Sequence, residues 1–382
     1  MLPGTFRGAH SRPPLRYHRQ VRIGIIGAGI IGCSVGWRLA RHGADVTLFE
    51  QHAVGGGATR ASAGALVPYV EAKEWGPLQE LVVRSLNLYD VFIEELRGVS
   101  RRTINYERCG SLEVAFTESE ECALRAAAAR AAADGITWLE AAEAREMEPA
   151  LSEAIRGAVF VGMHGRVSAP GLTAALAEAA AVSGAVFRSA RVTGVREVSG
   201  GAQVLSDTGA TEPFDRVIVA TGAWSSLLQL NGHCRVPVRP VKGQLLRLRG
   251  VPVSRLLWSH GCYVVPQGNH DLLVGATMEE AGFDDRPTTS GMLQLLRAAQ
   301  VLVPQVADAE FVEARVGLRP ATTDSLPILG YARESESLIY SVGHFRNGIV
   351  LAPLTARILA DLVLDDVSDP ALAVVAPGRF GL

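Results

Sequence analysis

Three glycines at fixed spacing and one downstream acid form the clearest chemical pattern in the sequence. Gly27, Gly29 and Gly32 follow an apolar run at residues 21–26, and Glu50 ends a second apolar run. Glycines at this spacing permit a tight turn, a close approach of a pyrophosphate to the backbone, and close packing of helix on strand. An acid at this distance accepts hydrogen bonds from a ribose diol. The pattern therefore predicts a site for an adenine dinucleotide.

The elements that must position these residues can be read from the same stretch. A strand at residues 21–26, a helix over residues 33–42 and a strand at residues 45–49 would place the helix N-terminus against the phosphates. Later segments return to the same sheet. They are a helix from residue 169 to about 183, a strand at 185–188, a hairpin-like pair at 192–198 and 203–206, a buried strand within 214–224, and a strand at 337–343 with a helix from about 347.

Between the segments of this sheet lie two stretches with a different sequence pattern, which we interpret as insertions. Residues 101–162 hold short strands and an alanine-rich helix at 122–133, and residues 237–315 hold alternating strand patterns at 243–249, 262–266 and 271–278. We expect an α/β protein in which a Rossmann-like domain with a parallel sheet is interleaved with an α+β substrate domain built on an antiparallel sheet. The first domain would comprise residues 21–100, 163–236 and 316–382, the second residues 101–162 and 237–315, with residues 1–20 as a disordered tail.

Composition excludes several classes of function. The formal net charge of the 382 residues is −2, so no basic surface for nucleic acid is expected. The 5 cysteines are scattered and never form a CxxC pair, which argues against a metal site and for a reducing compartment, here the cytoplasm. The most apolar late segment, residues 349–364, is interrupted by Pro353, Arg357 and Asp361, so no membrane span is expected.

The glycine pattern alone leaves NAD and FAD open, and two further segments favour FAD. Residues 55–66 form a second loop of small residues directly after Glu50, as a long cofactor needs for close approach. Residues 343–349 begin a helix whose N-terminal amides would face something negative. A reduced flavin carries negative charge on its pyrimidine ring, whereas a nicotinamide gains none.

Several motifs together resemble one protein family over residues 21–365. The chain resembles the thiamine-biosynthesis glycine oxidases of the D-amino-acid oxidase family. The motifs that carry the resemblance are, in order, residues 27–32 with Glu50, 59–66, 220–225, 241–244, 260–266, 274–278, 317–320 and 343–349.

The resemblance assigns roles to four residues of the substrate site. Arg319 would grip the substrate carboxylate through two parallel hydrogen bonds, although an ion pair with Asp324 or Glu313 is the structural alternative. Tyr263 would add a phenolic hydrogen bond to the same carboxylate. Met278, at the end of its strand, would form part of the wall of the substrate pocket. The backbone carbonyl of Arg346 would face the substrate amine.

The resemblance also assigns the residues that would contact FAD. They are Gly27, Gly29, Ile30, Ile31, Gly32, Glu50, Gln51, Ala58, Thr59, Ala63, Gly64, Ala65, Val192, Gly222, Trp224, His344, Phe345, Arg346, Asn347, Gly348, Ile349 and Val350.

The implied activity is oxidation of glycine, sarcosine or small D-amino acids by hydride transfer from Cα to flavin N5, with oxygen as acceptor and hydrogen peroxide as product. The partners would be the amino acid and oxygen, and the assembly a homotetramer. Residues 312–324 lack the cysteine by which the related sarcosine oxidases attach flavin, so we expect non-covalent FAD. Gly261 and Ala65 are smaller than the family's residues there and would enlarge the pocket.

Four alternatives stay open from the sequence. A D-amino-acid dehydrogenase would pass electrons to a different acceptor, or the enzyme would act as a sarcosine oxidase. A nicotinamide-dependent dehydrogenase would leave the helix start at residues 343–349 unexplained. A flavin-binding subunit without turnover would bind the cofactor and oxidise no amine.

Overall fold

A six-stranded sheet carries the predicted nucleotide site. We describe a computed structural model of the chain over residues 20–71, 76–231 and 236–382, so the predicted tail at residues 1–20 lies almost wholly outside the described residues. The strand order is β20-β21-β13-β1-β2-β9, and all neighbours run parallel except β20 with β21. The strands are β1 (Arg22–Ile26), β2 (Asp45–Glu50), β9 (Val186–Ser189), β13 (Arg216–Val219), β20 (Ile328–Tyr331) and β21 (Leu338–Val342).

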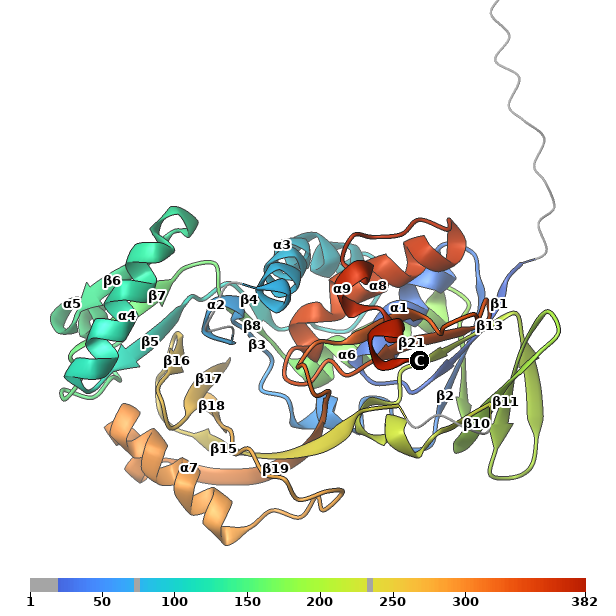
Figure 1. The fold of residues 1–382 in the computed structure, drawn as a ribbon. Coiled ribbons are helices and arrows are strands. Elements are labelled where there is room, and N and C mark those ends of the chain that lie inside the picture. The colour runs from blue at the N-terminus through green and yellow to red at the C-terminus, as the bar shows by residue number, and fades with distance from the viewer. Residues whose placement is uncertain (1–19, 72–75, 232–235) are drawn as a thin grey trace, which may run out of the picture.

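Helices cover one face of this sheet and a second sheet covers the other (Figure 1). The alternation of side chains along each strand produces the two faces: Ile218 packs with the helices, while Val217 and Val219 pack with the second sheet. The helices are α1 (Ile30–Arg41), α3 (Pro77–Arg97), α6 (Ala169–Val182) and α8 (Gly348–Leu364), and the second sheet has the order β12-β11-β10-β14, with β10 (Val192–Val198), β11 (Gly201–Ser206), β12 (Thr211–Phe214) and β14 (Gln229–Leu230).

The two predicted insertions merge into one eight-stranded sheet. Its order is β19-β15-β18-β17-β16-β5-β7-β6, and the parallel pair β16 with β5 joins the two halves. All other neighbouring pairs are antiparallel. The strands are β5 (Ser111–Ala115), β6 (Ile136–Glu140), β7 (Gly157–Val161), β15 (Arg239–Arg249), β16 (Leu256–Trp258), β17 (Tyr263–Gly268), β18 (Asp271–Gly275) and β19 (Glu310–Ala321).

Further helices and a small sheet complete the molecule. In Figure 1, α4 lies beside the β5–β7 end of the long sheet and α7 below β15 and β19. A small sheet, β3-β8-β4, ties the loop after Glu50 to residues of the first insertion. These elements are α2 (Pro68–Glu71), α4 (Glu118–Arg130), α5 (Ala141–Met147), α7 (Thr289–Leu302), α9 (Leu372–Val375), β3 (Ala65–Leu66), β4 (Tyr106–Glu107) and β8 (Gly165–Val167).

Several predicted element boundaries were wrong, and three of them are informative. Helix α1 begins at Ile30 rather than Cys33, because its first turn contains the glycine pattern itself. Helix α4 begins at Glu118 rather than Cys122, because Thr117 and Glu120 form a capping box there. Strand β18 ends at Gly275, so Met278 lies beyond it.

The predicted α/β class, with one parallel and one antiparallel sheet, is confirmed. The division into two domains stays a prediction. Its boundary at residue 316 falls inside β19, which runs on into the antiparallel sheet.

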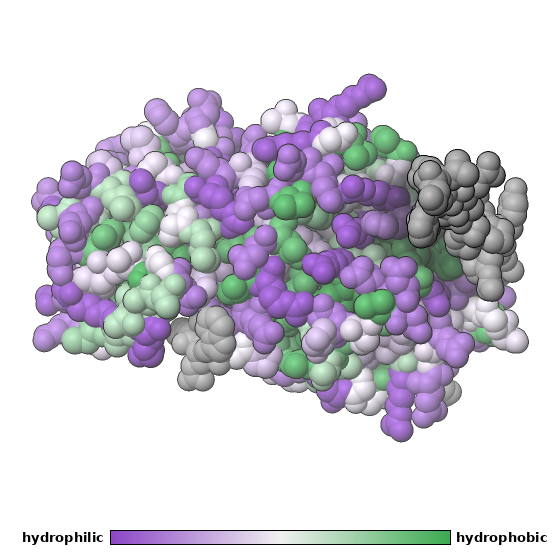
Figure 2. Space-filling model, turned by 90° about the horizontal axis from the view of Figure 1, so that it is seen from above, coloured by the Kyte–Doolittle hydropathy of each residue, from purple (hydrophilic) through white to green (hydrophobic). Residues whose placement is uncertain are grey.

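The outer surface is mainly hydrophilic on the face seen from above, where hydrophobic residues lie in small groups between polar ones (Figure 2). Within the described ranges, no helix combines the length and apolarity needed to span a bilayer.

Candidate active site

A cavity of about 1230 Å³ lies between the parallel sheet and the long antiparallel sheet. One side is formed by loops that follow β1, β2, β13 and β21, and the opposite side by β15, β17 and β19. This volume exceeds the range of roughly 300–1,000 Å³ usual for drug-sized ligands, as expected for a long cofactor and a substrate together.

The glycine turn after β1 has the geometry that the sequence predicts. Gly27 has a φ of +106°, which side chains rarely adopt, and a Cβ there would also overlap the Ala220 carbonyl. A Cβ on Gly32 would overlap the Gly27 carbonyl, so this residue serves the packing of α1 and does not line the cavity. Gly29 lines the cavity and has only Thr59 Oγ1 near its hypothetical Cβ, at 3.5 Å. The turn therefore leaves its open side toward a phosphate.

Backbone amides hold the Glu50 carboxylate at the end of β2. Its Oε2 accepts from the Ala28 N–H at 3.0 Å, and its Oε1 accepts from the His52 N–H at 3.0 Å. Each carboxylate oxygen has a further lone pair, so a ribose diol can still donate to it. Glu50 and Gln51 both line the cavity.

The small-residue loop after Glu50 is anchored against the glycine turn. Its Gly55 N–H donates to the Ala28 carbonyl at 2.9 Å, and Thr59 Oγ1 accepts from the Ile30 N–H at 3.1 Å. A Cβ on Gly64 would overlap the Val167 carbonyl, so only glycine lets this loop lie on β8. The loop lines the cavity through residues 56–59 and 61–65, which include the predicted Ala58, Ala63 and Ala65.

A turn at residues 343–347 leads into α8 at the other end of the cavity. Its Phe345 N–H donates to the Pro320 carbonyl at 2.9 Å, which ties the turn to β19. Burial lowers the pKa of His344 to about 3, so the imidazole is neutral, and its Nε2 lies 3.2 Å from Thr355 Oγ1. Gly348 begins α8 and lines the cavity, so the helix N-terminus is directed at it.

One face of the antiparallel sheet forms the floor of the cavity at this end. Arg319 is half-buried there, and its Nη1 donates to the Thr277 carbonyl at 2.9 Å. A Cβ on Gly243 would overlap the Arg319 guanidinium, and one on Gly275 would overlap the Tyr263 ring. The two glycines therefore make room for the two polar side chains on the sheet surface.

An ion pair of Arg319 with Asp324 or Glu313, the structural alternative to binding a substrate, is not observed among the described residues. Asp324 pairs with Arg379 at 2.7 Å, and Glu313 pairs with Arg315 at 2.6 Å. No carboxylate is within ion-pair distance of Arg319 in the described part of the chain. Its guanidinium is therefore available to a carboxylate inside the cavity.

Most of the predicted site residues come together here. Besides those already placed, the cavity is lined by Ile30, Ile31, Val192, Gly222, Trp224, Tyr263, Arg346 and Ile349.

Met278 does not wall this cavity. It lies beyond the end of β18 with 59% of its surface exposed, and Ala276 lines the cavity in that segment instead. Gly261 is also absent from the lining and faces Ala298 of α7, so its small size does not enlarge the cavity. Asn347 and Val350 are buried at the start of α8 behind the lining.

Three aromatic residues of the cavity are absent from the predicted site: Phe49, Trp258 and Phe283. Trp258 stacks on Tyr263 with 4.6 Å between ring centroids. The two residues lie opposite each other in the strand pair β16 and β17, so this pairing could have indicated that Trp258 lies near the site. Phe283 lies in the segment between β18 and α7, with its ring 6.4 Å from that of Trp224. No local pattern indicates this contact, because Trp224 is distant in the sequence.

Comparisons with known proteins agree with these geometric findings. The family model described as FAD dependent oxidoreductase matches residues 22–362. A glycine oxidase from Geobacillus kaustophilus is 39% identical, with 89% of this chain and 92% of that protein covered. The bifunctional protein ThiO/ThiG from Nostoc sp. is 34% identical, with 92% of this chain and 54% of that protein covered.

Solved structures show the same relationship. The crystal structure of glycine oxidase from Geobacillus kaustophilus has a TM-score of 0.87 at 37% identity and covers 94% of this chain and 98% of its own. That of iminodiacetate oxidase from Chelativorans sp. has a TM-score of 0.85 at 32% identity and covers 93% and 99%. The resemblance predicted from the motifs is thereby confirmed.

Proposed function

Because this chain belongs to the family of FAD dependent oxidoreductases, we propose that it is an amino acid oxidase acting on glycine and related small amines. Sarcosine and small D-amino acids are the related amines. The products are the 2-oxo acid, the released amine (ammonia from glycine) and hydrogen peroxide. The proposal includes a role in forming the thiazole of thiamine, as the resemblance implies. It is supported by relatives that are glycine oxidases and match nearly the whole chain.

The residues present fit FAD. The open side of the Gly29 turn suits the pyrophosphate, the Glu50 carboxylate suits the ribose diol, and the N-terminus of α8 suits the pyrimidine end of a flavin. When bound, FAD accepts the hydride from the substrate Cα and returns the electrons to oxygen. We propose that it is held non-covalently, since no cysteine is among the described residues that line the cavity. Flavin that stays with acid-precipitated protein would contradict this.

The Arg319 guanidinium on the cavity floor is the observation that carries the proposal. It offers its remaining N–H groups to the substrate carboxylate, and Tyr263 lies on the same sheet face to add a phenolic donor. The Arg346 backbone carbonyl, in the turn before α8, would accept from the substrate amine. Together these groups fix the Cα with its hydrogen toward the cofactor.

The mechanism needs no dedicated base provided that the substrate amine binds in its neutral form. Two histidines line the described cavity: His52 follows Glu50, and the ring of His344 is buried against Thr355. After hydride loss the substrate is an imine, which water hydrolyses to the 2-oxo acid and the amine. The chain's own contribution is therefore orientation and exclusion of water.

Peroxide production tests the reaction. FAD-loaded protein is given glycine, sarcosine or D-alanine in air, and hydrogen peroxide is measured for each. Peroxide from at least one of the three supports the oxidase. If none yields peroxide while anaerobic glycine still bleaches the flavin, the enzyme is a dehydrogenase with another acceptor.

Substitution of Arg319 tests the substrate site. Arg319→Ala should cost about 2–5 kcal/mol in kcat/KM for glycine, because it leaves a carboxylate unpaired in a closed pocket. The flavin content of the purified protein should stay the same. Arg315→Ala is the matched control, because Arg315 lies on the same strand and pairs with Glu313. A normal kcat/KM in Arg319→Ala would refute the assignment.

A further inference from the structure

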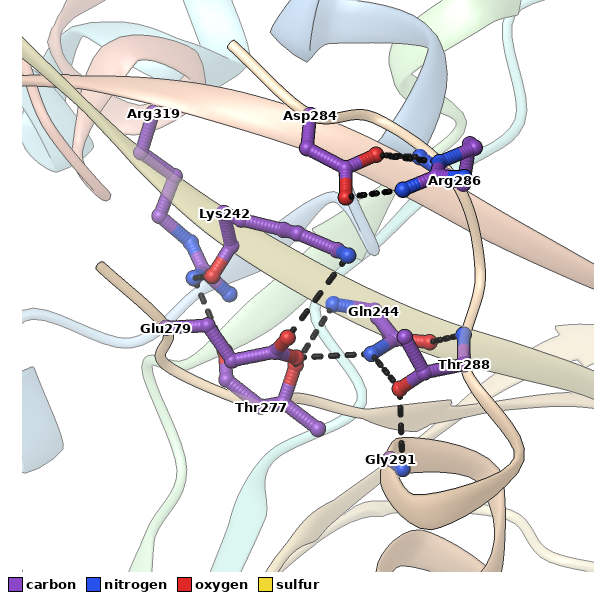
Figure 3. Close-up of polar contacts among 9 residues, drawn as sticks. All are labelled: Lys242, Gln244, Thr277, Glu279, Asp284, Arg286, Thr288, Gly291 and Arg319. Carbon is purple, nitrogen blue, oxygen red and sulfur yellow. Dashed lines mark hydrogen bonds and ion pairs between the residues drawn. The ribbon is translucent and has the colours of Figure 1, made fainter. Parts of the chain in front are cut away.

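A buried polar network lies behind Arg319, on the opposite face of β15. It consists of Gln244, Thr277, Glu279 and Thr288, and we refer to it as the Gln244 network (Figure 3). Gln244 has 0% of its surface exposed. A buried amide has to be hydrogen-bonded to avoid a cost of desolvation, so such a network defines one geometry.

The Gln244 side chain makes three hydrogen bonds to two residues, Glu279 and Thr288. Its Nε2 donates to Glu279 Oε1 at 2.7 Å and to Thr288 Oγ1 at 2.9 Å, while its Oε1 accepts from the Thr288 N–H at 2.7 Å. A Cβ on Gly291, in the first turn of α7, would overlap the Gln244 amide. The site is therefore shaped around an amide of this length.

The backbone of Gln244 holds Thr277 as well. The Gln244 N–H donates to Thr277 Oγ1 at 2.9 Å, and its carbonyl accepts from the Thr277 N–H at 3.2 Å. Thr277 Oγ1 in turn donates to Glu279 Oε1 at 2.5 Å. Thr277 is thus held through its backbone N–H and its hydroxyl, and its carbonyl is left to face Arg319.

Lys242 also holds Glu279 in place, through both its backbone and its side chain. Its backbone exchanges two hydrogen bonds with Glu279, both of 2.9 Å. Its side chain has only 1% of its surface exposed, and its Nζ lies 3.7 Å from Glu279 Oε2. Since a buried ammonium needs a counter-charge, the Glu279 carboxylate is held in place on this side too.

The Thr277 carbonyl is the acceptor for Arg319 Nη1, at 2.9 Å. The other nitrogens of this guanidinium have no partner among the described residues. Nη1 also donates to the Lys242 carbonyl at 3.5 Å, so two backbone carbonyls hold the guanidinium. Because a guanidinium is planar and its donors keep a fixed fork geometry, these two bonds set the direction in which the other nitrogens point.

Gln244 also controls the segment that borders the cavity between β18 and α7. It holds Thr277 and Glu279 at the start of residues 276–288 and Thr288 at the end. Phe283 and Asp285, between these anchors, line the cavity. The Gln244 side chain thus secures both ends of this segment through Glu279 and Thr288, and the Gln244 backbone holds Thr277.

We propose that Gln244 is a positioning residue for the substrate carboxylate, which it orients by fixing the Thr277 carbonyl that receives the Arg319 guanidinium. The inference rests on the proposed function, in which Arg319 binds that carboxylate. Gln244 is one of the residues that line the cavity, but in this role its side chain contacts neither substrate nor cofactor. It acts through Thr277 and Arg319.

The test is a titration of FAD-loaded protein with acetate, a carboxylate without an oxidisable amine, followed by the flavin absorbance. Gln244→Met keeps the length of the side chain and removes its hydrogen bonds to Glu279 and Thr288, while the backbone bonds to Thr277 remain. Without the side-chain bonds, Glu279 no longer holds the Thr277 hydroxyl in one place. We expect the Kd for acetate to rise about tenfold, within the range of coupling between residues of one network. The flavin content and the rate constant for anaerobic reduction at saturating glycine should change far less than this Kd.

A double variant separates positioning from general destabilisation. If Gln244 acts through Arg319, adding Gln244→Met to Arg319→Ala raises the acetate Kd no further. Multiplying effects would overturn the inference. Glu279→Gln keeps the shape of the network and provides a second test should Gln244→Met fail to fold. It should also raise the acetate Kd.

The matched control is Asp271→Asn, a buried polar residue of the adjacent strand that pairs with Arg247 and Arg249, away from Thr277. It should destabilise the protein and leave the acetate Kd unchanged. An equal rise in Kd for this control would refute a specific role of Gln244. If Arg319→Ala itself leaves acetate binding intact, the proposed carboxylate site fails. If Arg319→Ala weakens acetate binding but the Gln244 and Glu279 variants do not, the inference about Gln244 fails while the proposed carboxylate site stands.

Discussion

Gly29 and Gly32 belong to one sequence pattern, yet different neighbours restrict them. Gly32 is limited by the protein itself, because a Cβ there would overlap the Gly27 carbonyl. Gly29 has φ −75° and only Thr59 Oγ1 nearby, so the unliganded protein has room for a methyl group. In the proposed function the restriction at Gly29 comes from the cofactor, which would approach its backbone.

The two glycines should therefore respond differently to alanine. Gly32→Ala should destabilise the apoprotein, because backbone must move to accept the new Cβ. Gly29→Ala should leave the unfolding midpoint of the apoprotein unchanged and weaken FAD binding. Thermal unfolding of apoprotein and FAD titration by fluorescence would measure the two effects. Equal thermal destabilisation by both substitutions would contradict this account.

At the scale of elements, local capping decides where a helix begins. Thr117 Oγ1 accepts from the Glu120 N–H at 3.2 Å, and the Glu120 carboxylate accepts from the Thr117 N–H at 2.9 Å. This capping box starts α4 four residues before the alanine-rich run from which its start was predicted. The apolar content of a helix is thus a poorer guide to its first residue than its cap.

Loss of this cap should weaken α4 and leave the active site intact. Thr117→Ala removes the hydroxyl that satisfies the Glu120 N–H, and we expect a loss of about 1 kcal/mol in the free energy of unfolding. Urea denaturation would measure it. Ser119→Ala, an exposed neighbour in the first turn, is the control and should change stability by less than about 0.5 kcal/mol. Oxidase activity should be normal in both variants.

At the scale of the whole molecule, the active site exists only where two sheets meet. The long sheet contributes its face and the parallel sheet contributes the loops at its strand ends. His164 lies at another junction, between β7 and β8. Its Nδ1 is 2.6 Å from Ser111 Oγ, and its Nε2 accepts from the Tyr69 N–H at 3.4 Å. Burial, with a smaller contribution from nearby Arg108, lowers its pKa from 6.5 to about 3.

This buried histidine should make the fold sensitive to acid. Its pKa is lower in the folded than in the unfolded chain, so protons bind the unfolded chain first as pH falls. The stability it contributes is complete above pH 6.5 and is lost progressively down to about pH 3. Within this window the loss approaches about 1.4 kcal/mol per pH unit.

Replacement of His164 tests this dependence. Denaturant unfolding between pH 7 and pH 4 should show a shallower loss of stability in His164→Gln than in the parent protein, by up to about 1.4 kcal/mol per pH unit. The exposed His42 provides the control, and His42→Gln should follow the parent's profile. Parallel profiles for His164→Gln and the parent would show that His164 does not contribute.

The cofactor half of the site was predictable from the sequence because its parts are neighbours in the chain. The glycine turn, Glu50 and the following loop all lie within residues 27–66, where short-range spacing determines a strand, a turn and a helix start. The family motifs extended the prediction to Arg319 and Tyr263, and the structure brings both to the cavity floor.

The tertiary structure alone decided how the half of the cavity around Arg319 is built. Arg319, Gly243 and Thr277 come from β19, from β15 and from the segment after β18, and they meet through strand register. A shift by one residue would move every side chain to the other face of the sheet, and local sequence does not encode which strands pair. For the same reason the sequence misplaces Met278 and assigns no role to Gln244, although Gln244 lies in the motif at residues 241–244. Their positions depend on where β18 ends and on what lies across from it.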